Sequence, residues 1–146
     1  MILNDAGKMV YAEWMNLQER FSNIEIDVFQ IMPDHFHGII IIHTPVGAGL
    51  VPSVGAGLVP TPTRVAPTIG EIVGAFKSIT THEYIQGVEK FAWPVFYKRL
   101  WQRNYYEHII RGQADYERIA DYILDNPARW DKDEDPKNTS RIRSWR

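Results

Sequence analysis

The sequence contains no cysteine, which excludes disulfides and thiolate metal sites and fits a reducing compartment such as the cytoplasm. It also lacks a long apolar run: the four isoleucines at 39–42 fall far short of the roughly 20 residues that cross a membrane. The first residues have neither the basic nor the apolar region of a signal peptide. The formal net charge of −2 gives no general attraction to nucleic acid, so any such binding must come from a local patch. We therefore expect a cytoplasmic protein with no membrane partner.

The 146 residues are 45% hydrophobic and 12% aromatic, which is enough for one domain with a real core. A possible cap at Asn4 or Asp5 precedes apolar residues at helical spacing: Val10, Trp14, Leu17 and Phe21. A strand is predicted next, because apolar and acidic residues alternate through Ile24, Ile26 and Val28. Pro33 and Asp34 end this strand, and a second one over 35–44 would pair with it through a short turn.

The second half of the chain predicts two further helices and one strand. Thr68 and Glu71 have the spacing of a capping box and begin a helix with an apolar face at Ile72, Val73, Phe76, Ile79 and Tyr84. Residues 96–110 are aromatic-rich and strand-like. Residues 112–127 predict a helix that Pro127 stops, with a stripe of Tyr116, Ile119, Ala120 and Ile123. The order of elements predicts an α+β domain with helices over an antiparallel sheet.

Residues 46–61 repeat an eight-residue unit, VGAGLVPS then VGAGLVPT. Proline and glycine give it weak helix and strand signals, and two copies are too few for a solenoid. We expect a flexible low-complexity loop over 46–66 within a single domain at 1–130. Residues 131–146 are a charged C-terminal tail.

The segment "MPDHFHGIIII" places His35 and His37 two residues apart. Alternate residues of a strand point to the same face, so the two imidazoles can chelate a divalent ion. The alternative is a pair of half-exposed histidines that hydrogen-bond to their neighbours at a strand start. His-x-His also occurs in zinc hydrolases, which need a third ligand and an open position.

The helix at 113–126 offers partners for the histidines. Tyr122 and Asn126 are four residues apart and share one face. A tyrosine hydroxyl can be a nucleophile, and an asparagine carbonyl is a hard oxygen ligand. The alternatives are a core tyrosine and a helix-end asparagine before Pro127. Tyr105, Tyr106 and Tyr116 compete with Tyr122 for the role of nucleophile.

Four motifs in register, "MPDHFHGIIII", "FKSITTHEY", "WQRNYYEHIIR" and "DYILDNPARW", give the chain its resemblance to a known family. It resembles the REP-associated tyrosine transposases, which are single-tyrosine HUH transposases named for His-hydrophobe-His. The resemblance covers nearly the whole chain apart from the duplicated loop and the tail.

The resemblance implies a ferredoxin-like fold and a metal-dependent DNA-nicking and joining enzyme. His35 and His37 match the HUH pair, Tyr122 matches the nucleophile, and Asn126 matches the third metal ligand. A magnesium or manganese ion would polarise the scissile phosphate of single-stranded or hairpin DNA. Attack by Tyr122 would leave a 5′-phosphotyrosine and a free 3′-hydroxyl.

DNA contacts are expected from basic residues near the aromatic segment: Lys77, Lys98, Arg99, Arg103 and Arg111. Such groups can neutralise phosphates, while Trp101, Tyr105 and Tyr106 can stack on unpaired bases. Arg141, Arg143 and Arg146 add positive charge to the tail. The alternative is a solvated charged face over buried aromatics.

The chain departs from the family at its start, because the first helix begins by about residue 5 and the family's first strand is missing. The true gene could start upstream, the remaining strands could re-pair, or a second subunit could fill the gap, so a monomer and a dimer both remain open. Three functions follow: a DNA strand-transfer enzyme, a catalytically decayed hairpin-binding protein, and a metal-dependent hydrolase without a covalent intermediate.

Overall fold

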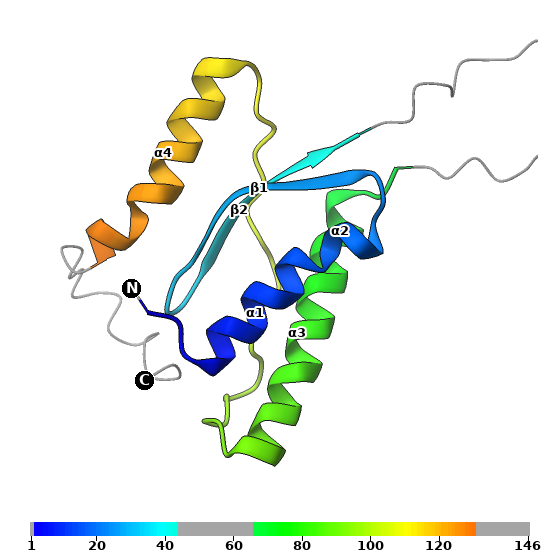
Figure 1. Ribbon diagram of the computed structural model, residues 1–146, viewed down its shortest axis with the longest axis vertical. Coiled ribbons are helices and arrows are strands. Elements are labelled where there is room, and N and C mark those ends of the chain that lie inside the picture. Colours follow the sequence, from blue (N-terminus) through cyan, green and yellow to red (C-terminus); the bar gives the residue numbers. More distant parts are fainter. Residues whose placement is uncertain (1, 44–65, 131–146) are drawn as a thin grey trace, which may run out of the picture.

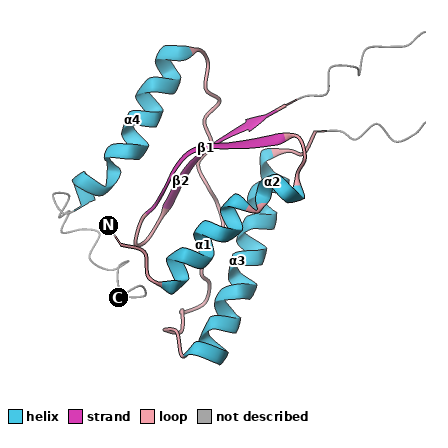
Figure 2. Ribbon diagram, in the orientation of Figure 1, coloured by secondary structure: helices cyan, strands magenta, loops and turns pink. Residues whose placement is uncertain are grey.

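The computed structural model describes residues 2–43 and 66–130, which form an α+β fold with helices packed on a two-stranded antiparallel sheet (Figures 1 and 2). The elements in chain order are α1 (Asp5–Met15), α2 (Leu17–Arg20), β1 (Ile24–Ile31), β2 (Phe36–Ile42), α3 (Ile69–Phe91) and α4 (Gln113–Trp130). The duplicated segment at 46–61 and the tail at 131–146 lie outside the described residues. No helix within 2–43 or 66–130 has both the length and the apolarity to cross a membrane.

The first helix begins where its cap was expected. The Asn4 side chain accepts a hydrogen bond of 2.8 Å from the backbone N–H of Gly7, which satisfies one of the donors left open at a helix start. The predicted apolar stripe is buried at Val10, Trp14 and Leu17. A break at Asn16 separates α1 from α2. Helix α2 ends at Arg20, and β1 begins at Ile24.

The hairpin formed by β1 and β2 contains an irregularity that the alternation of residues did not predict. Ile26 pairs with Ile40 and Phe29 pairs with Gly38, so Asp27 and Val28 together lie opposite Ile39. Two residues opposite one define a β-bulge. Val28 was expected on the same face as Ile24 and Ile26, but it packs against the opposite cluster of side chains. The extra residue changes the phase of the strand and causes the difference.

The two faces of the hairpin carry separate cores. The larger core lies between the hairpin, α1 and α3, and its buried residues are Val10, Trp14, Leu17, Ile24, Ile31, Ile72 and Phe76. The smaller core lies between the hairpin and α4, and its buried residues are Ile39, Ala120 and Ile123. Figure 1 shows α4 on one side of the hairpin and both α1 and α3 on the other. The sheet is therefore covered on both faces, with α4 alone on its own side.

Helix α3 has the expected capping box. Thr68 Oγ1 accepts from the N–H of Glu71 at 3.2 Å, and the Glu71 carboxylate accepts from the N–H of Thr68 at 2.7 Å. Ile72, Phe76 and Tyr84 are buried along its length, while Val73 and Ile79 are half-buried. The helix ends at Phe91, and Ala92 takes the left-handed conformation with φ 54°.

The strand predicted for 96–110 is wrong: residues 92–112 run from α3 to α4 without regular secondary structure. Side chains of α3 hold this segment instead of a neighbouring strand. The Tyr84 hydroxyl donates to the carbonyl of Pro94 at 2.9 Å, Trp101 Nε1 donates to Thr80 Oγ1 at 2.8 Å, and Lys77 Nζ donates to the carbonyl of Gln102 at 2.9 Å. The aromatic residues that suggested a strand are anchors onto a helix, so tertiary contacts override their strand propensity.

Helix α4 begins as predicted and buries Ala120 and Ile123, with Tyr116 and Ile119 packed beside them. The prediction that Pro127 stops the helix is wrong, because α4 continues to Trp130. A proline inside a helix removes one backbone donor. Here only three residues follow it within the helix, so the missing donor affects one backbone hydrogen bond near the end of α4 and leaves the preceding turns intact.

Candidate metal and nucleophile site

His35 and His37 lie together at the beginning of β2. Their ring centroids are 4.8 Å apart with the planes at 74°. The backbone N–H of Met32 donates to the carbonyl of His35 at 2.9 Å. This bond closes the turn of the hairpin and fixes the backbone position of His35. Alternation along the strand then turns His37 to the same side, which is the side that carries α4. The two imidazoles therefore lie side by side on one face of the hairpin.

A carboxylate orients the first of these rings. Asp34 Oδ1 and His35 Nδ1 are 2.6 Å apart. Because an ionised carboxylate only accepts, this bond requires the ring proton on Nδ1, and in the neutral ring the lone pair then lies on Nε2, where it can bind a metal. Metal-binding histidines commonly donate their other N–H to a carboxylate. The motif alone assigned Asp34 no role, although its position next to His35 was a usable signal.

The second ring is held in its neutral form. Burial lowers the pKa of His37 below its ordinary value, and the neighbouring His35 lowers it further. A neutral imidazole is the form that coordinates a metal. The hairpin thus presents one oriented and one largely uncharged imidazole on the same face.

Tyr122 reaches this pair from α4. Its ring centroid is 5.4 Å from that of His37, with the planes at 77°, and the residue is 49% exposed. The tyrosine is therefore beside the histidines and accessible to a large substrate. Asn126 follows one helical turn later and is 9% exposed. The four-residue spacing puts Asn126 on the same face of α4 as Tyr122.

A shallow depression of about 320 Å³ adjoins the tyrosine and is lined by Arg118, Asp121, Tyr122 and Asp125. Arg118 was not predicted as a site residue, although it stands four residues before Tyr122 and therefore on the same helical face. Its guanidinium is exposed and pairs with Asp115 Oδ1 at 2.6 Å. A second depression, of about 520 Å³, is formed by α1 and α3 and contains none of these residues.

The donor atoms can be compared with those that divalent ions prefer. Within residues 2–43 and 66–130, no three side chains of the types His, Cys, Asp and Glu converge on one point. A metal held by His35 and His37 therefore needs another kind of third ligand, and the amide oxygen of Asn126 is the predicted one. Two imidazole nitrogens with one amide oxygen suit Mn²⁺ better than Mg²⁺, which favours oxygen ligands.

The competing tyrosines occupy other positions. The hydroxyl of Tyr116 donates to Asp27 Oδ2 at 2.8 Å, and this hydrogen bond raises the pKa of the Tyr116 phenol. Tyr105 lies under the ammonium group of Lys77, 5.3 Å from its ring centroid. Tyr106 is 91% exposed on the segment that connects α3 to α4. Among the tyrosines described, Tyr122 is the one with a ring contact to His37.

The predicted DNA-contacting residues fall into two groups. Lys98, Arg99, Arg103 and Arg111 are exposed along the segment 92–112. Lys77 is half-buried on α3, and its ammonium group donates to the carbonyls of Gln102 and Asn104 at 2.9 and 3.5 Å. Partial burial lowers the pKa of Lys77. Lys77 therefore anchors the segment that carries the other four residues.

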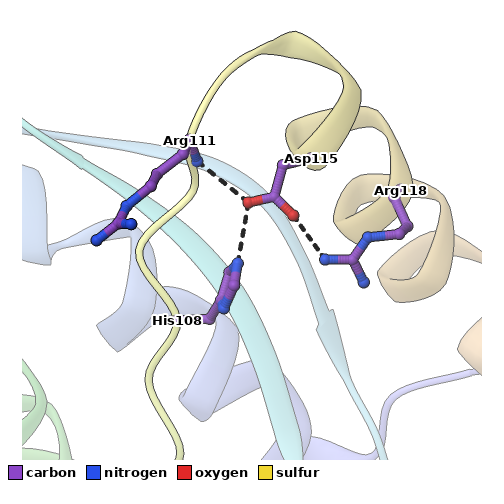
Figure 3. A network of polar contacts seen from close by, with 4 residues as sticks. All are labelled: His108, Arg111, Asp115 and Arg118. Carbon is purple, nitrogen blue, oxygen red and sulfur yellow. Dashed lines mark hydrogen bonds and ion pairs between the residues drawn. The ribbon is translucent and has the colours of Figure 1, made fainter.

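A polar network joins that segment to the first turn of α4 (Figure 3). Asp115 accepts from His108 Nε2 at 2.9 Å, from the backbone N–H of Arg111 at 3.1 Å and from Arg118 at 2.6 Å. The hydrogen bond from His108, followed by those from Arg111 and Arg118, lowers the pKa of Asp115 far below its ordinary value. The guanidinium of Arg111 points away from Asp115 and stays exposed.

Comparison with known proteins finds a relative in Haemophilus influenzae that is described as an uncharacterized protein. The two sequences are 40% identical over 136 residues, which cover 92% of this chain and 71% of the relative. No protein-family model matches the chain, and no solved structure matches it.

Proposed function

The chain belongs to the same family as the uncharacterized Haemophilus influenzae protein, and we propose that it is a metal-dependent enzyme that cuts and rejoins single-stranded or hairpin DNA. The observation that carries this proposal is the contact between Tyr122 and His37, with His35 beside them. The proposal also rests on the resemblance of four sequence motifs to the REP-associated tyrosine transposases. A cytoplasmic location is part of it, because DNA is the substrate.

The metal would be held by His35, His37 and Asn126. When bound, Mg²⁺ or Mn²⁺ neutralises charge on phosphoryl oxygens and helps to orient the phosphate. The protein's own contribution begins with Asp34, which fixes the tautomer of His35. His37 contributes a neutral imidazole, and Arg118 brings a positive charge to the face of α4 that carries Tyr122.

Tyr122 is the nucleophile in this proposal. Its hydroxyl oxygen forms a bond to phosphorus while the bond from phosphorus to the 3′ oxygen breaks. The phenol proton passes to solvent, and the departing 3′ oxygen takes up a proton to become a hydroxyl. The phosphodiester energy is retained in the 5′-phosphotyrosine, so the strand can be rejoined without ATP. Tyr116 is a poorer candidate, because Asp27 holds its hydroxyl and raises its pKa.

The segment 92–112 supplies a surface for the DNA strand. Lys98, Arg99, Arg103 and Arg111 are exposed on it, and so are the rings of Tyr105 and Tyr106. Cations bind the phosphate backbone while aromatic rings stack on unpaired bases, a combination that suits single strands of varied sequence. The negative overall charge of the chain leaves this local surface to do the binding.

The second candidate function is a protein that binds DNA hairpins but has lost the ability to cleave DNA. The described residues form a sheet of two strands, and residues 92–112 add none to it. A sheet this small gives less support to a site that must be held rigid, which favours binding over catalysis.

The decisive experiment incubates the protein with Mn²⁺ and a pool of imperfect DNA hairpins whose single-stranded flanks are randomised. The DNA is labelled at its 3′ end, because the proposed adduct retains the fragment on that side of the cut. We expect a labelled protein band that resists denaturant. Tyr122→Phe should abolish both the adduct and cleavage while hairpin binding remains.

Tyr11→Phe is the matched control, since it removes a hydroxyl from an exposed tyrosine on α1, outside the proposed DNA surface. It should form the adduct at the wild-type rate. Cleavage by Tyr122→Phe at the wild-type rate would contradict the proposal and favour a metal-dependent hydrolase. Hairpin binding by the wild type without any cleavage would favour the second candidate.

A further inference from the structure

The bulge in β1 presents an acidic residue to the helix that carries Tyr122. Asp27 and Val28 share the position opposite Ile39, and both contact α4 or its core: Val28 packs in the smaller core, and Asp27 bonds to Tyr116. In a regular strand one of these two residues would face α1 and α3 instead. Because of the extra residue, Asp27 and Val28 both lie on the side of the sheet that carries α4.

The bond between Asp27 and Tyr116 is polar, directional and long-range in sequence. The phenol of Tyr116 donates to Asp27 Oδ2 at 2.8 Å, and the two residues are 89 positions apart. Hydrogen bonds to a carboxylate are stronger than those between neutral groups and fix the distance and angle of the donor. The same bond raises the pKa of the Tyr116 phenol.

Within the smaller core, the contacts of α4 with the sheet are apolar. Ile39, Ala120 and Ile123 form the buried part of the smaller core, and apolar contacts alone place little restriction on rotation or sliding of a helix. Tyr116 precedes Tyr122 by six residues, which is about 9 Å along a helix axis. A fixed point at Tyr116 therefore sets both the height and the rotation at which Tyr122 meets His37.

We infer that Asp27 and Tyr116 form a positioning pair that holds the nucleophile helix in register with the two histidines. Neither residue touches the reacting atoms; both act through the placement of Tyr122. The inference rests on the proposed function for its catalytic consequence, but the placement itself can be measured without any reaction. The network around Asp115 holds the neighbouring turn to residues 108–111, whereas the Asp27–Tyr116 bond ties α4 to the sheet.

The test uses Tyr116→Phe, which keeps the ring in the smaller core and removes the donor. In the free protein, NMR signals of the His37 ring protons report the position of the Tyr122 ring, whose ring current acts on them at 5.4 Å. Tyr122→Leu gives the signals without that ring, and His37→Gln identifies which signals belong to His37. We expect Tyr116→Phe to move the His37 signals towards those of Tyr122→Leu, and Tyr106→Phe to leave them unchanged.

With hairpin DNA, the same substitution should slow adduct formation under single-turnover conditions by ~10–100-fold, because a small misplacement of a reacting group has effects of this size. The hairpin Kd should stay within about twofold, since neither residue belongs to the DNA-binding segment. Asp27→Asn keeps a carbonyl acceptor, so this variant should retain most of the wild-type rate of adduct formation and nearly wild-type His37 signals. Asp27→Leu should match Tyr116→Phe, and the double variant should be no worse than either.

Wild-type His37 signals and a wild-type rate in Tyr116→Phe would overturn the inference. A lower Tm with unchanged His37 signals would overturn it too, because the pair would then stabilise the fold without placing the nucleophile. If the wild type forms no adduct with any hairpin, the proposed function fails, and the His37 signals still decide whether Asp27 and Tyr116 position α4.

Discussion

The imidazole of His37 and the phenol ring of Tyr122 meet edge to face, with their centroids 5.4 Å apart. This contact joins the first strand residues after the hairpin turn to a helix that begins about 75 residues later in the chain. Tyr122 and the histidine pair are therefore neighbours in space although they lie far apart in the sequence.

Metal binding should depend on His37 and its neighbours. We expect His37→Ala to weaken Mn²⁺ binding by more than ~10-fold, and Asp34→Asn to weaken it by ~10–100-fold through the loss of the His35 tautomer. Mn²⁺ should bind more tightly than Mg²⁺, because two donors are imidazole nitrogens. Titration calorimetry of the free protein measures these affinities.

The matched control for this prediction is His43→Ala. His43 also lies at an end of β2, and its nearest charged partner is Glu25 at 3.4 Å. It should bind Mn²⁺ as the wild type does. Equal affinities in the wild type, His37→Ala and Asp34→Asn would contradict the metal site.

Two glycines of α3 should respond in opposite ways to alanine. A Cβ at Gly87 would clash with the ring of Trp93, whereas a Cβ at Gly74 would meet open space. Gly87→Ala should therefore lower the free energy of unfolding by ~1–3 kcal/mol. Gly74→Ala should raise it by ~0.5–1 kcal/mol, because alanine favours the helix. Urea unfolding measures both, and a stabilised Gly87→Ala protein would show that Trp93 does not pack there.

The bond between Trp101 and Thr80 should contribute to stability through its buried hydroxyl. Thr80 is fully buried, and its Oγ1 accepts from Trp101 Nε1 at 2.8 Å. Thr80→Val keeps the shape but leaves the indole N–H without its acceptor, which should cost ~1–3 kcal/mol of unfolding free energy. Thr81→Val is the control, since Thr81 Oγ1 donates only back to the carbonyl of Lys77 in its own helix. Equal stability of the two variants in urea would argue against this anchor.

Stability should fall in acid through Asp115. Its folded pKa lies below its unfolded value of about 4, so ionised Asp115 stabilises the fold above that pH. The contribution is lost as the pH falls below about 4 towards the folded pKa. We expect the Tm of the wild type to exceed that of Asp115→Asn at pH 5–7, with the difference shrinking below pH 4. A constant difference from pH 7 to pH 2 would contradict this assignment.

Local sequence signals were enough for the parts of the fold that depend on near neighbours. Thr68 and Glu71 form their capping box, Asn4 caps α1, and the two-residue spacing of His35 and His37 puts both rings on one face. In each case the interacting groups lie within four residues of one another. Period and capping chemistry then determine the geometry without help from the rest of the chain.

The predictions that failed concern features whose interacting residues lie far apart in the sequence. The alternation of Ile24, Ile26 and Val28 does not reveal the bulge. Asp27 accepts its hydrogen bond from Tyr116, which lies 89 positions away in the sequence. Residues 96–110 have strand-like composition, yet contacts from α3 take the place of a neighbouring strand. Arg118 was missed because its relevance appears once Tyr122 is fixed as a site residue.

The isolation of α4 on its face of the sheet has a thermodynamic consequence. Among the described residues, its core has three buried members, against seven in the core on the opposite face. Regions with fewer buried apolar contacts open at lower free energy than the whole domain unfolds. Amide hydrogens of α4 should therefore exchange with solvent earlier than those of α3, through sub-global opening. The residue proposed to attack DNA is therefore carried on a helix that is expected to open before α3 does.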